Sequence, residues 1–251
     1  MDLQEQLEYQ GNWLFKYRGI LPVIILIAGI IVLIYSELNP VKFFKDIASF
    51  MDYYTIACIF ICLTGLAIRV YTVGYTPDNT SGRNTSEQIA ETLNRTGIYA
   101  IVRHPLYVGN FLMWLGIALA VQNFWFVFVF ALVYWIYYER IMYAEEQFLR
   151  RKFGQAYLEW AERTPAFIPN FKLFVKPATP FRWKKVLKQE KNGLLALFVI
   201  FSLFDFIGEF VRKKYDFNFA LYIICFITII LYCVLRYLKK NTQLLNDTKL
   251  V

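Results

Sequence analysis

The sequence predicts an all-α, polytopic membrane protein with about six transmembrane helices, and three observations support this. Hydrophobic residues make up 58% of the 251 residues and charged residues only 18%, whereas soluble chains average about 45–50% and 25%. The hydrophobic residues form long runs, each close to the roughly 20 residues that a spanning helix needs. These runs lack the alternation of a transmembrane β-barrel. Because backbone in lipid must satisfy its own hydrogen bonds, we expect helices.

Six segments qualify as spanning helices. They cover residues 19–36, 53–73, 105–121, 124–143, 193–210 and 217–238. The third segment is short for a span, and only Gln122 and Asn123 separate it from the fourth. We therefore expect the third and fourth segments to form a tight antiparallel hairpin.

The connecting segments divide the chain into four parts. Residues 1–75 hold an N-terminal segment and two spans, with Trp13 and Tyr17 placed near the headgroups of a membrane interface. Residues 76–171 hold a polar loop (76–96), the hairpin and a polar, helical segment (144–163) expected at the interface. Residues 172–192 are a basic linker, and 193–251 are a C-terminal hairpin and tail.

The net charge of +8 is unequally distributed about these spans. If the N-terminus shares a side with the segment after residue 143, that side holds 22 Lys and Arg residues and the opposite side holds five. This asymmetry predicts that both termini are cytoplasmic, with residues 212–214 as a local exception. Nucleic-acid binding is excluded because the basic residues flank apolar runs and do not cover one polar domain.

Two further sets of residues inside the spans are interpreted as structural. The four cysteines, Cys58, Cys62, Cys225 and Cys233, are expected to be small buried residues, and no metal site is predicted because no histidine accompanies them. Asp205 and Glu209, near the outer end of the fifth span, are interpreted as a solvated helix end in preference to an ion path.

His104, the only histidine of the chain, is the first candidate for chemistry. Pro105 after it favours an extended conformation at His104 and fits the first position of a helix. A helix that begins here presents free N–H groups and a positive dipole end, which bind carboxylates or phosphates. Arg103 adds charge, and Gly109 permits close approach of a ligand one turn deeper. The alternative is a structural cap with an arginine anchored to headgroups.

Glu145 and Glu146 are the second candidate. About 18 residues separate His104 from the turn of the hairpin and about 23 separate the turn from Glu146, so the two arms measure roughly 27 and 35 Å. His104 and the acidic pair therefore lie near one level of the membrane. Alone, the acids would be a solvated helix end. Opposite a basic helix N-terminus, they complete a pocket that suits a zwitterion with an additional positive charge.

The same region carries a family resemblance. The motifs are Gly97-Ile98-Tyr99, Arg103-His104-Pro105-x-Tyr107-x-Gly109, Glu145-Glu146-x-x-Leu149, Phe153-Gly154-x-x-Tyr157, Thr164-Pro165 and Ile168-Pro169, in that order. Together they resemble the isoprenylcysteine carboxyl methyltransferase and phospholipid methyltransferase superfamily of integral membrane enzymes. The resemblance covers residues 84–171 and leaves out the C-terminal hairpin.

The resemblance implies S-adenosylmethionine as methyl donor, bound at the cytoplasmic end of the hairpin. The implied cofactor site comprises Tyr99, Arg103, His104, Pro105, Leu106, Tyr107, Gly109, Glu145 and Glu146. Arg140 and Glu146 are the candidate catalytic residues, since an arginine shortly before the acidic pair contacts the acceptor in the isoprenylcysteine branch; Arg140 is about one position out of register. Further cofactor contacts of that branch fall at Asn84, Glu91 and Asn94.

The acceptor stays open at this point. A membrane lipid or a lipidated carboxylate, phosphate or amine is expected to arrive through the bilayer, and no metal is required. The competing enzyme is an NADPH-dependent, sterol-reductase-like protein, which shares the Arg-His-x-x-Tyr-x-Gly stretch; the tandem Glu145-Glu146 and Pro105 favour the methyltransferase. A membrane scaffold or transporter leaves the charged cluster without a purpose.

Overall fold

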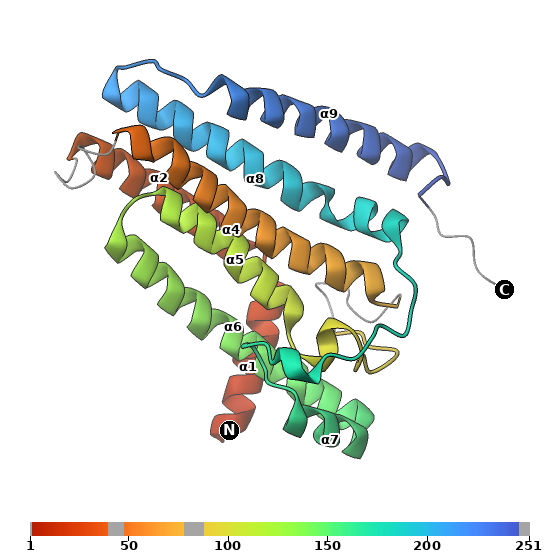
Figure 1. Ribbon diagram of the computed structural model, residues 1–251. Helices are drawn as coiled ribbons and strands as arrows, with labels where there is room; N and C mark the ends of the chain where they lie inside the picture. The colour runs from red at the N-terminus through yellow and green to blue at the C-terminus, as the bar shows by residue number, and fades with distance from the viewer. Residues whose placement is uncertain (1, 40–47, 78–87, 246–251) are drawn as a thin grey trace.

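The computed structural model describes residues 2–39, 48–77 and 88–245, and these are almost entirely helical (Figure 1). The α-helices are α1 (Leu3–Lys16), α2 (Ile20–Leu38), α4 (Ala48–Tyr75), α5 (Pro105–Ala120), α6 (Phe124–Phe153), α7 (Gln155–Arg163), α8 (Trp183–Arg212) and α9 (Phe219–Asn241). Two short 3₁₀ turns cover Ile98–Ala100 and Phe171–Leu173. The all-α prediction is confirmed.

Helices α2, α4, α5, α6, α8 and α9 lie side by side in alternating directions, with α8 and α9 along one edge of the bundle and α6 along the other (Figure 1). Helix α4 packs against both α5 and α8, and α5 packs against α6. The C-terminal ends of α4 and α6 and the N-terminal ends of α5 and α8 therefore meet at one end of the bundle. The connection of α5 to α6 is tight, as predicted, with Gln122 in a left-handed conformation and Asn123 capping α6.

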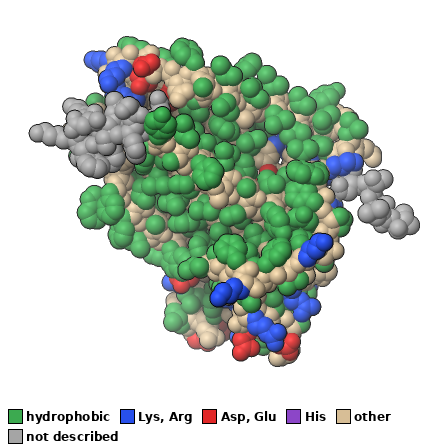
Figure 2. Space-filling model, in the orientation of Figure 1, with side chains coloured by type: hydrophobic (Ala, Val, Ile, Leu, Met, Phe, Trp, Pro, Cys, Tyr) green, Lys and Arg blue, Asp and Glu red, His purple; other side chains and the backbone are tan. Residues whose placement is uncertain are grey.

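Five helices, α2, α4, α6, α8 and α9, are long and apolar enough to cross a membrane. Helix α5, with 16 residues, is shorter than the others, in keeping with its expected shortness. The surface is covered with hydrophobic side chains, and charged side chains gather at two ends of it (Figure 2). Exposed Ile24, Phe128 and Phe226 contribute to this apolar surface. The protein is therefore an integral, multi-pass membrane protein.

Small residues bring α4 and α5 into close contact. A Cβ atom on Gly65 would lie 2.4 Å from the carbonyl oxygen of Gly109, so a larger residue there would push the helices apart. One turn further, the Cys62 thiol donates a hydrogen bond to the Met113 carbonyl oxygen (3.0 Å). Cys58, Cys62 and Cys225 are buried, as predicted. Cys233 is exposed, against the prediction: it lies on α9, which has neighbours on one side only (Figure 1).

The polar segment after the fourth span is helical, as predicted, but it is divided between two helices. Residues 144–153 continue α6, and Gly154 then breaks the helix with a φ of +54°, a conformation that favours glycine. Helix α7 follows and turns back toward the bundle (Figure 1). Its Tyr157 is buried, and the Trp160 indole donates to the Tyr99 carbonyl oxygen (3.1 Å).

The basic segment 172–192 is not a linker throughout, because α8 begins at Trp183. Lys185 explains this extension: its ammonium group is buried and donates hydrogen bonds to the carbonyl oxygens of Thr76 (2.6 Å) and Pro77 (3.0 Å) at the end of α4. A cation at a helix C-terminus satisfies carbonyl groups that have no partner within the helix. Lys185 therefore caps the C-terminal end of α4.

The N-terminal segment forms α1, which packs against α6. Asp2 caps α1 by accepting a hydrogen bond from the Glu5 amide (2.8 Å). Gly11 is buried against the Arg140 carbonyl oxygen and Ala144 of α6, while Trp13 and Tyr17 are exposed. Helix α1 therefore covers the part of α6 that precedes the acidic pair.

Candidate functional site

The site is built on the segment that leads into α5. Arg103 and His104 donate their backbone N–H groups to the carbonyl oxygens of Pro165 (2.9 Å) and Ala166 (3.2 Å), which follow α7. His104 is the N-cap residue of α5, with φ −120° and ψ 60°, and Pro105 opens the helix as predicted. The backbone thus fixes His104 at the end of the bundle where α6 also ends.

His104 lies between the two carboxylates of the acidic pair. Its Nε2 atom is 2.9 Å from Glu146 Oε1, and its Nδ1 atom is 3.5 Å from Glu145 Oε2. The His104 side chain is 5% exposed. The prediction from helix lengths that His104 meets the acidic pair is confirmed.

Two neighbours complete what we call the His104 cluster, namely Arg103, His104, Tyr107, Glu145 and Glu146. Arg103 Nη1 is 3.3 Å from Glu146 Oε2. The Tyr107 hydroxyl donates a hydrogen bond to Glu145 Oε1 (2.8 Å). The Tyr134 hydroxyl in turn donates to the Tyr107 carbonyl oxygen (2.8 Å) and so ties α6 to the first turn of α5.

The carboxylates control the protonation of His104. Burial by itself would lower the pKa of the imidazole, because it disfavours the charged form. Hydrogen bonds and charge interactions with Glu145 and Glu146 outweigh burial and raise the pKa of His104 above its ordinary value. The cluster therefore favours an imidazolium that bridges two carboxylates.

The His104 cluster borders a cavity of about 360 Å³, which we call the main cavity. This volume falls within the ~300–1,000 Å³ range of small-molecule sites. Seven of the predicted site residues line the main cavity: Tyr99, Arg103, His104, Pro105, Leu106, Tyr107 and Glu145. Of the acidic pair, Glu145 faces the cavity, whereas Glu146 is not among its lining residues and pairs with His104 and Arg103.

Two buried polar atoms beside the main cavity have no hydrogen-bond partner among the described residues. They are Arg103 Nε and the Tyr157 hydroxyl. Both residues line the cavity. Buried donors in folded proteins are almost always paired. These two atoms therefore indicate a site for a polar ligand.

Gly109 and Arg140 lie away from the main cavity. The space beside Gly109 is filled by α4, since a Cβ atom there would lie 2.6 Å from Arg69 Cγ and 2.8 Å from the Gly65 carbonyl oxygen. Gly109 thus allows two helices to approach each other. Arg140 lies beside its neighbour Glu139, 3.7 Å from Nη1 to Oε2, and is not a lining residue.

Only some residues of the polar loop line the main cavity. Residues 88–90 and 92–94 line the main cavity, which includes Asn94 as predicted. Glu91 is exposed and does not line it. Asn84 lies outside the described residues.

The sequence interpretation missed a polar network in the interior of the bundle. Arg69 of α4 forms a bidentate pair with Glu190 of α8, with Nε–Oε2 and Nη2–Oε1 distances of 2.8 Å, and its Nη1 atom donates to Asn110 Oδ1 (2.6 Å). Arg69 and Asn110 line the main cavity. Polar residues within apolar spans are costly and mark functional positions, so the positions of Arg69 and Asn110 inside predicted spans were the available signal.

Residues from the N-terminal part also line the main cavity. They are Phe15, Arg18 and Pro22, at the junction of α1 and α2. The Arg18 guanidinium lies 4.1 Å from the centre of the Phe15 ring. No motif marked this junction, because its approach to the site depends on the packing of α1 against α6.

Comparison with known proteins finds relatives for the part of the chain that runs from α4 to the start of α7. Residues 53–156 match the family described as phospholipid methyltransferase. The protein-S-isoprenylcysteine O-methyltransferase of Schizosaccharomyces pombe is 35% identical over 95 residues, which cover 36% of this chain and 40% of the relative. Protein-S-isoprenylcysteine O-methyltransferase B of Arabidopsis thaliana is 43% identical over 75 residues, covering 29% and 37%.

A further relative carries a different name. The nickel-cobalt-cadmium resistance protein NccN of Alcaligenes xylosoxydans xylosoxydans is 33% identical over 99 residues, covering 39% of this chain and 44% of the relative. The matches with these three relatives thus span less than half of each protein's length. No solved structure gives a significant match.

Proposed function

We propose that this protein is an integral membrane methyltransferase, because residues 53–156 match the family described as phospholipid methyltransferase and the similar protein of Schizosaccharomyces pombe is a protein-S-isoprenylcysteine O-methyltransferase. It uses S-adenosylmethionine and transfers the methyl group to a membrane-embedded acceptor. Residues 53–156 reach from α4 to the start of α7 and so include the whole His104 cluster.

One observation carries the proposal: the His104 cluster presents opposite charges to one cavity. Glu145 contributes a carboxylate to the lining, while Arg103 and the N-terminus of α5 contribute positive potential. The methyl donor carries an ammonium group and a sulfonium, both positive, and one carboxylate. The unpaired Arg103 Nε and Tyr157 hydroxyl supply further donors. The residues present therefore fit this ligand.

The two acids have different roles in this proposal. Glu145 would hold the positive part of the donor, because it lies in the cavity wall. Glu146 would act behind the wall, where it fixes His104 and Arg103 at 2.9 and 3.3 Å. The Tyr107 hydroxyl keeps the Glu145 carboxylate in place. Groups held by such partners lose less freedom when a ligand binds, which favours catalytic positioning.

The chemistry needs orientation above all. When bound, S-adenosylmethionine supplies an activated methyl group: the acceptor's lone pair bonds to the methyl carbon while the carbon–sulfur bond breaks and its electrons return to sulfur. The chain's part is to align the reactants and to exclude water from the cavity, which the burial of the cluster supports. We further propose that this end of the bundle is cytoplasmic, as the distribution of Lys and Arg indicates.

Calorimetry on detergent-solubilised protein tests the proposal. We expect micromolar binding of S-adenosylmethionine or of its demethylated product. His104→Ala and Glu146→Ala should each weaken binding tenfold or more, because each removes a support of the cavity wall. Glu139→Ala, on the same helix but half exposed, is the matched control and should leave affinity within twofold.

The same titration separates the alternative enzyme. Binding of NADPH without binding of S-adenosylmethionine would overturn the methyltransferase assignment and favour a sterol-reductase-like enzyme. Binding of neither compound by folded protein would also contradict the proposal and leave a scaffold or transporter as the better explanation.

A further inference from the structure

The α7–α8 loop (residues 164–182), which connects these two helices, carries a surface groove outside the main cavity. The groove has a volume of about 860 Å³ and is lined by residues 161–165 and 168–172 together with Arg103. We call it the loop groove. Its charged lining residues are three cations, Arg103, Arg163 and Lys172, and one carboxylate, Glu162. The loop groove therefore has an excess of positive charge.

We propose that the loop groove binds the phosphate-bearing head group of an anionic phospholipid, while exposed apolar side chains of the α7–α8 loop lie among the acyl chains. Lipid bound there also stabilises the backbone that holds the His104 cluster, so lipid binding and cofactor binding favour each other. The first part is independent of the proposed function. The second part, the link to the cofactor, rests on it.

Large apolar side chains of the loop are exposed beside the groove. Ile168 and Phe171, which line the groove, are 77% and 75% exposed. Phe174 and Val175, which follow closely in the sequence, are exposed as well. Exposed apolar side chains gathered in this way mark a site of contact with a membrane or another molecule.

Phe167 shows that lipid is the partner within reach. Its ring packs edge-on against Trp135 of α6 and Phe111 of α5, with ring centres 5.4 and 5.9 Å apart. Phe111 lies about 9 Å along α5 from the start of that helix. Trp135 is exposed on a helix that is long and apolar enough to cross a membrane. The loop therefore reaches the lipid-facing side of the bundle, next to the level of His104.

Basic side chains accompany these apolar groups. Lys172 follows Phe171, Lys176 follows Val175, and Arg163 ends α7; all three cations are exposed. Guanidinium and ammonium groups donate strong hydrogen bonds to phosphate oxygens, and Lys or Arg near a membrane surface is attracted to anionic lipid. A soluble anion would satisfy the cations but would leave the apolar side chains in water. A phospholipid satisfies both.

The groove is held in shape by the segment that precedes α5. The Gly97 N–H group donates to the Val175 carbonyl oxygen (2.8 Å), and the Asn170 N–H group donates to the Ile101 carbonyl oxygen (2.9 Å). Asn170 Oδ1 accepts from the Lys172 amide (3.2 Å) and caps the 3₁₀ turn that begins at Phe171. Because the backbone is already fixed, a ligand loses less free energy in ordering it.

The loop groove is connected to the His104 cluster in two ways. Arg103 lines both the groove and the main cavity, and its Nη1 atom lies 3.3 Å from Glu146 Oε2. The loop carbonyl oxygens of Pro165 and Ala166 accept the backbone hydrogen bonds of Arg103 and His104. A lipid that stabilises the loop therefore stabilises the proposed cofactor site, and this coupling is reciprocal.

Native mass spectrometry of the detergent-solubilised protein tests lipid binding. The probes are dioleoyl phosphatidylglycerol and dioleoyl phosphatidylcholine, which share their chains and differ in head-group charge. We expect phosphatidylglycerol to bind at least tenfold more tightly, and Arg163→Gln combined with Lys172→Gln to weaken its binding at least tenfold. Lys239→Gln combined with Lys240→Gln, exposed at the end of α9, removes the same charge and should change this affinity less than twofold.

Two results would overturn the lipid site. One is an equal loss of affinity in the two double variants, which would show attraction to surface charge without a specific groove. The other is equal binding of the two lipids by the wild type. Phe171→Ser should weaken phosphatidylglycerol binding at least threefold without lowering the melting temperature, because Phe171 is exposed; unchanged affinity would contradict the insertion of the loop into lipid.

Competitors distinguish a lipid head group from other sources of negative charge. We expect neither inorganic phosphate nor a hexaglutamate peptide to displace phosphatidylglycerol when present at the same concentration as the lipid, since neither carries an acyl chain. Displacement by phosphate would identify a site for a free anion, and displacement by the peptide would identify a site for an acidic protein. Either result would overturn the assignment to a phospholipid.

Titration of S-adenosylhomocysteine into protein in nanodiscs tests the link to the His104 cluster. This ligand has no net charge, so the membrane surface does not concentrate it. Wild type should bind it at least threefold more tightly in phosphatidylglycerol than in phosphatidylcholine, and Arg163→Gln with Lys172→Gln should bind it equally in both. Equal affinities for the wild type would overturn the link. Absence of binding in both lipids would instead overturn the proposed function and leave the lipid site standing.

Discussion

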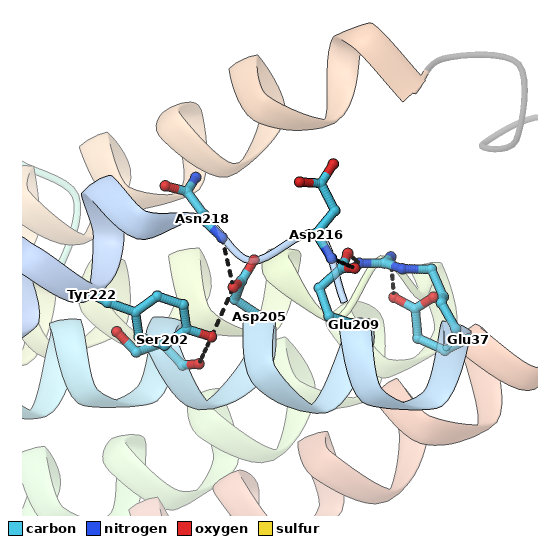
Figure 3. Close-up of polar contacts among 8 residues, drawn as sticks. Glu37, Ser202, Asp205, Glu209, Asp216, Asn218 and Tyr222 are labelled. Atoms are coloured by element: carbon cyan, nitrogen blue, oxygen red, sulfur yellow. Dashed lines mark hydrogen bonds and ion pairs between the residues drawn. The ribbon is translucent and has the colours of Figure 1, made fainter. Parts of the chain in front are cut away.

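The two ends of the helix bundle both carry buried carboxylates and arginines, yet they use them differently. At one end, the His104 cluster borders the main cavity and leaves Arg103 Nε and the Tyr157 hydroxyl without a partner among the described residues. At the opposite end, the carboxylates of α8 accept hydrogen bonds from donors of α8 itself, of the connection to α9 and of α9 (Figure 3). None of these opposite-end carboxylates lines the main cavity.

The contacts at the opposite end account for each carboxylate. Glu209 accepts hydrogen bonds from Arg212 (2.6 Å) and from the Asp216 amide (2.8 Å), and Arg212 also donates to Glu37 of α2 (2.8 Å). Asp205 accepts from the Tyr222 hydroxyl (2.9 Å) and the Asn218 amide (3.2 Å) (Figure 3). These bonds fix the turn between α8 and α9 and tie it to α2. The predicted solvated helix end is thus a paired network.

The difference shows what distinguishes a structural cluster from a binding site at a membrane boundary. Charge and burial are similar at the two ends, so neither property identifies function by itself. What differs is where the unpaired groups lie. The charged groups of the opposite end pair within the protein, and its buried Ser36 and Ser202 hydroxyls, unpaired among the described residues, do not line the main cavity, while the His104 cluster keeps unpaired donors beside that cavity. Buried polar groups without partners are costly, so their retention next to a cavity indicates that a ligand supplies the partners.

The largest effect on stability is expected from a substitution of Arg212, at the opposite end of the bundle. We expect Arg212→Met to destabilise the protein by about 2–3 kcal/mol, the lower part of the range for breaking a buried pair, because Arg212 is 28% exposed. The reason is that Glu209 and Glu37 would remain buried without their cation. Thermal melting in detergent measures the effect, with Lys239→Met, an exposed site at the end of α9, as control. Equal melting temperatures for the two variants would show that the network contributes nothing to stability.

The matching change at the other end is Glu145→Gln. Its amide keeps the shape of the side chain but loses the charge that faces the main cavity, so we expect S-adenosylmethionine affinity to fall about tenfold, roughly 1.4 kcal/mol, with little change in melting temperature. Calorimetry on the variant and on Glu139→Gln measures this. Unchanged affinity would place the cofactor's positive groups elsewhere.

Much of this architecture was predictable from the sequence, because it follows from hydrophobic run length and helix geometry. The tight hairpin at Gln122 and the meeting of His104 with Glu146 depend only on 1.5 Å per residue. The beginning of α8 at Trp183 was not predictable in the same way. It depends on Lys185 reaching the end of α4, a contact between residues that are far apart in the sequence.

The site was predictable where motifs mark it and not where packing creates it. Tyr99, His104 and Tyr107 carry local signals and line the main cavity. Gly109 carries a similar signal but faces α4, because a sequence does not reveal which side of a helix its neighbour covers. Arg69 and Glu190 pair across 121 positions, and no local pattern relates them.

The protonation of His104 makes the stability contributed by the His104 cluster depend on pH. Since the pKa of His104 is raised in the folded protein, its contribution to stability is fully present below its unfolded value of about 6.5 and is lost as pH rises through the folded value. The melting-temperature difference between wild type and His104→Gln should therefore be larger at about pH 6 than at about pH 9. The melting-temperature difference between wild type and Arg212→Met should not show this pH dependence, because Arg212 does not contact His104. A difference that grows with pH would mean that the imidazole is neutral in the cluster.

The smallest effect is expected at Arg140, which the family resemblance offers as an acceptor contact. The structure places its side chain, 32% exposed, next to Glu139 and outside the lining of the main cavity. An exposed pair of this kind contributes at most about 1 kcal/mol. Arg140→Ala should therefore change S-adenosylmethionine affinity, measured by calorimetry, by less than about threefold, whereas Glu145→Gln lowers it about tenfold. A larger loss of affinity for Arg140→Ala than for Glu145→Gln would contradict this and would require Arg140 to turn toward the main cavity when the cofactor binds.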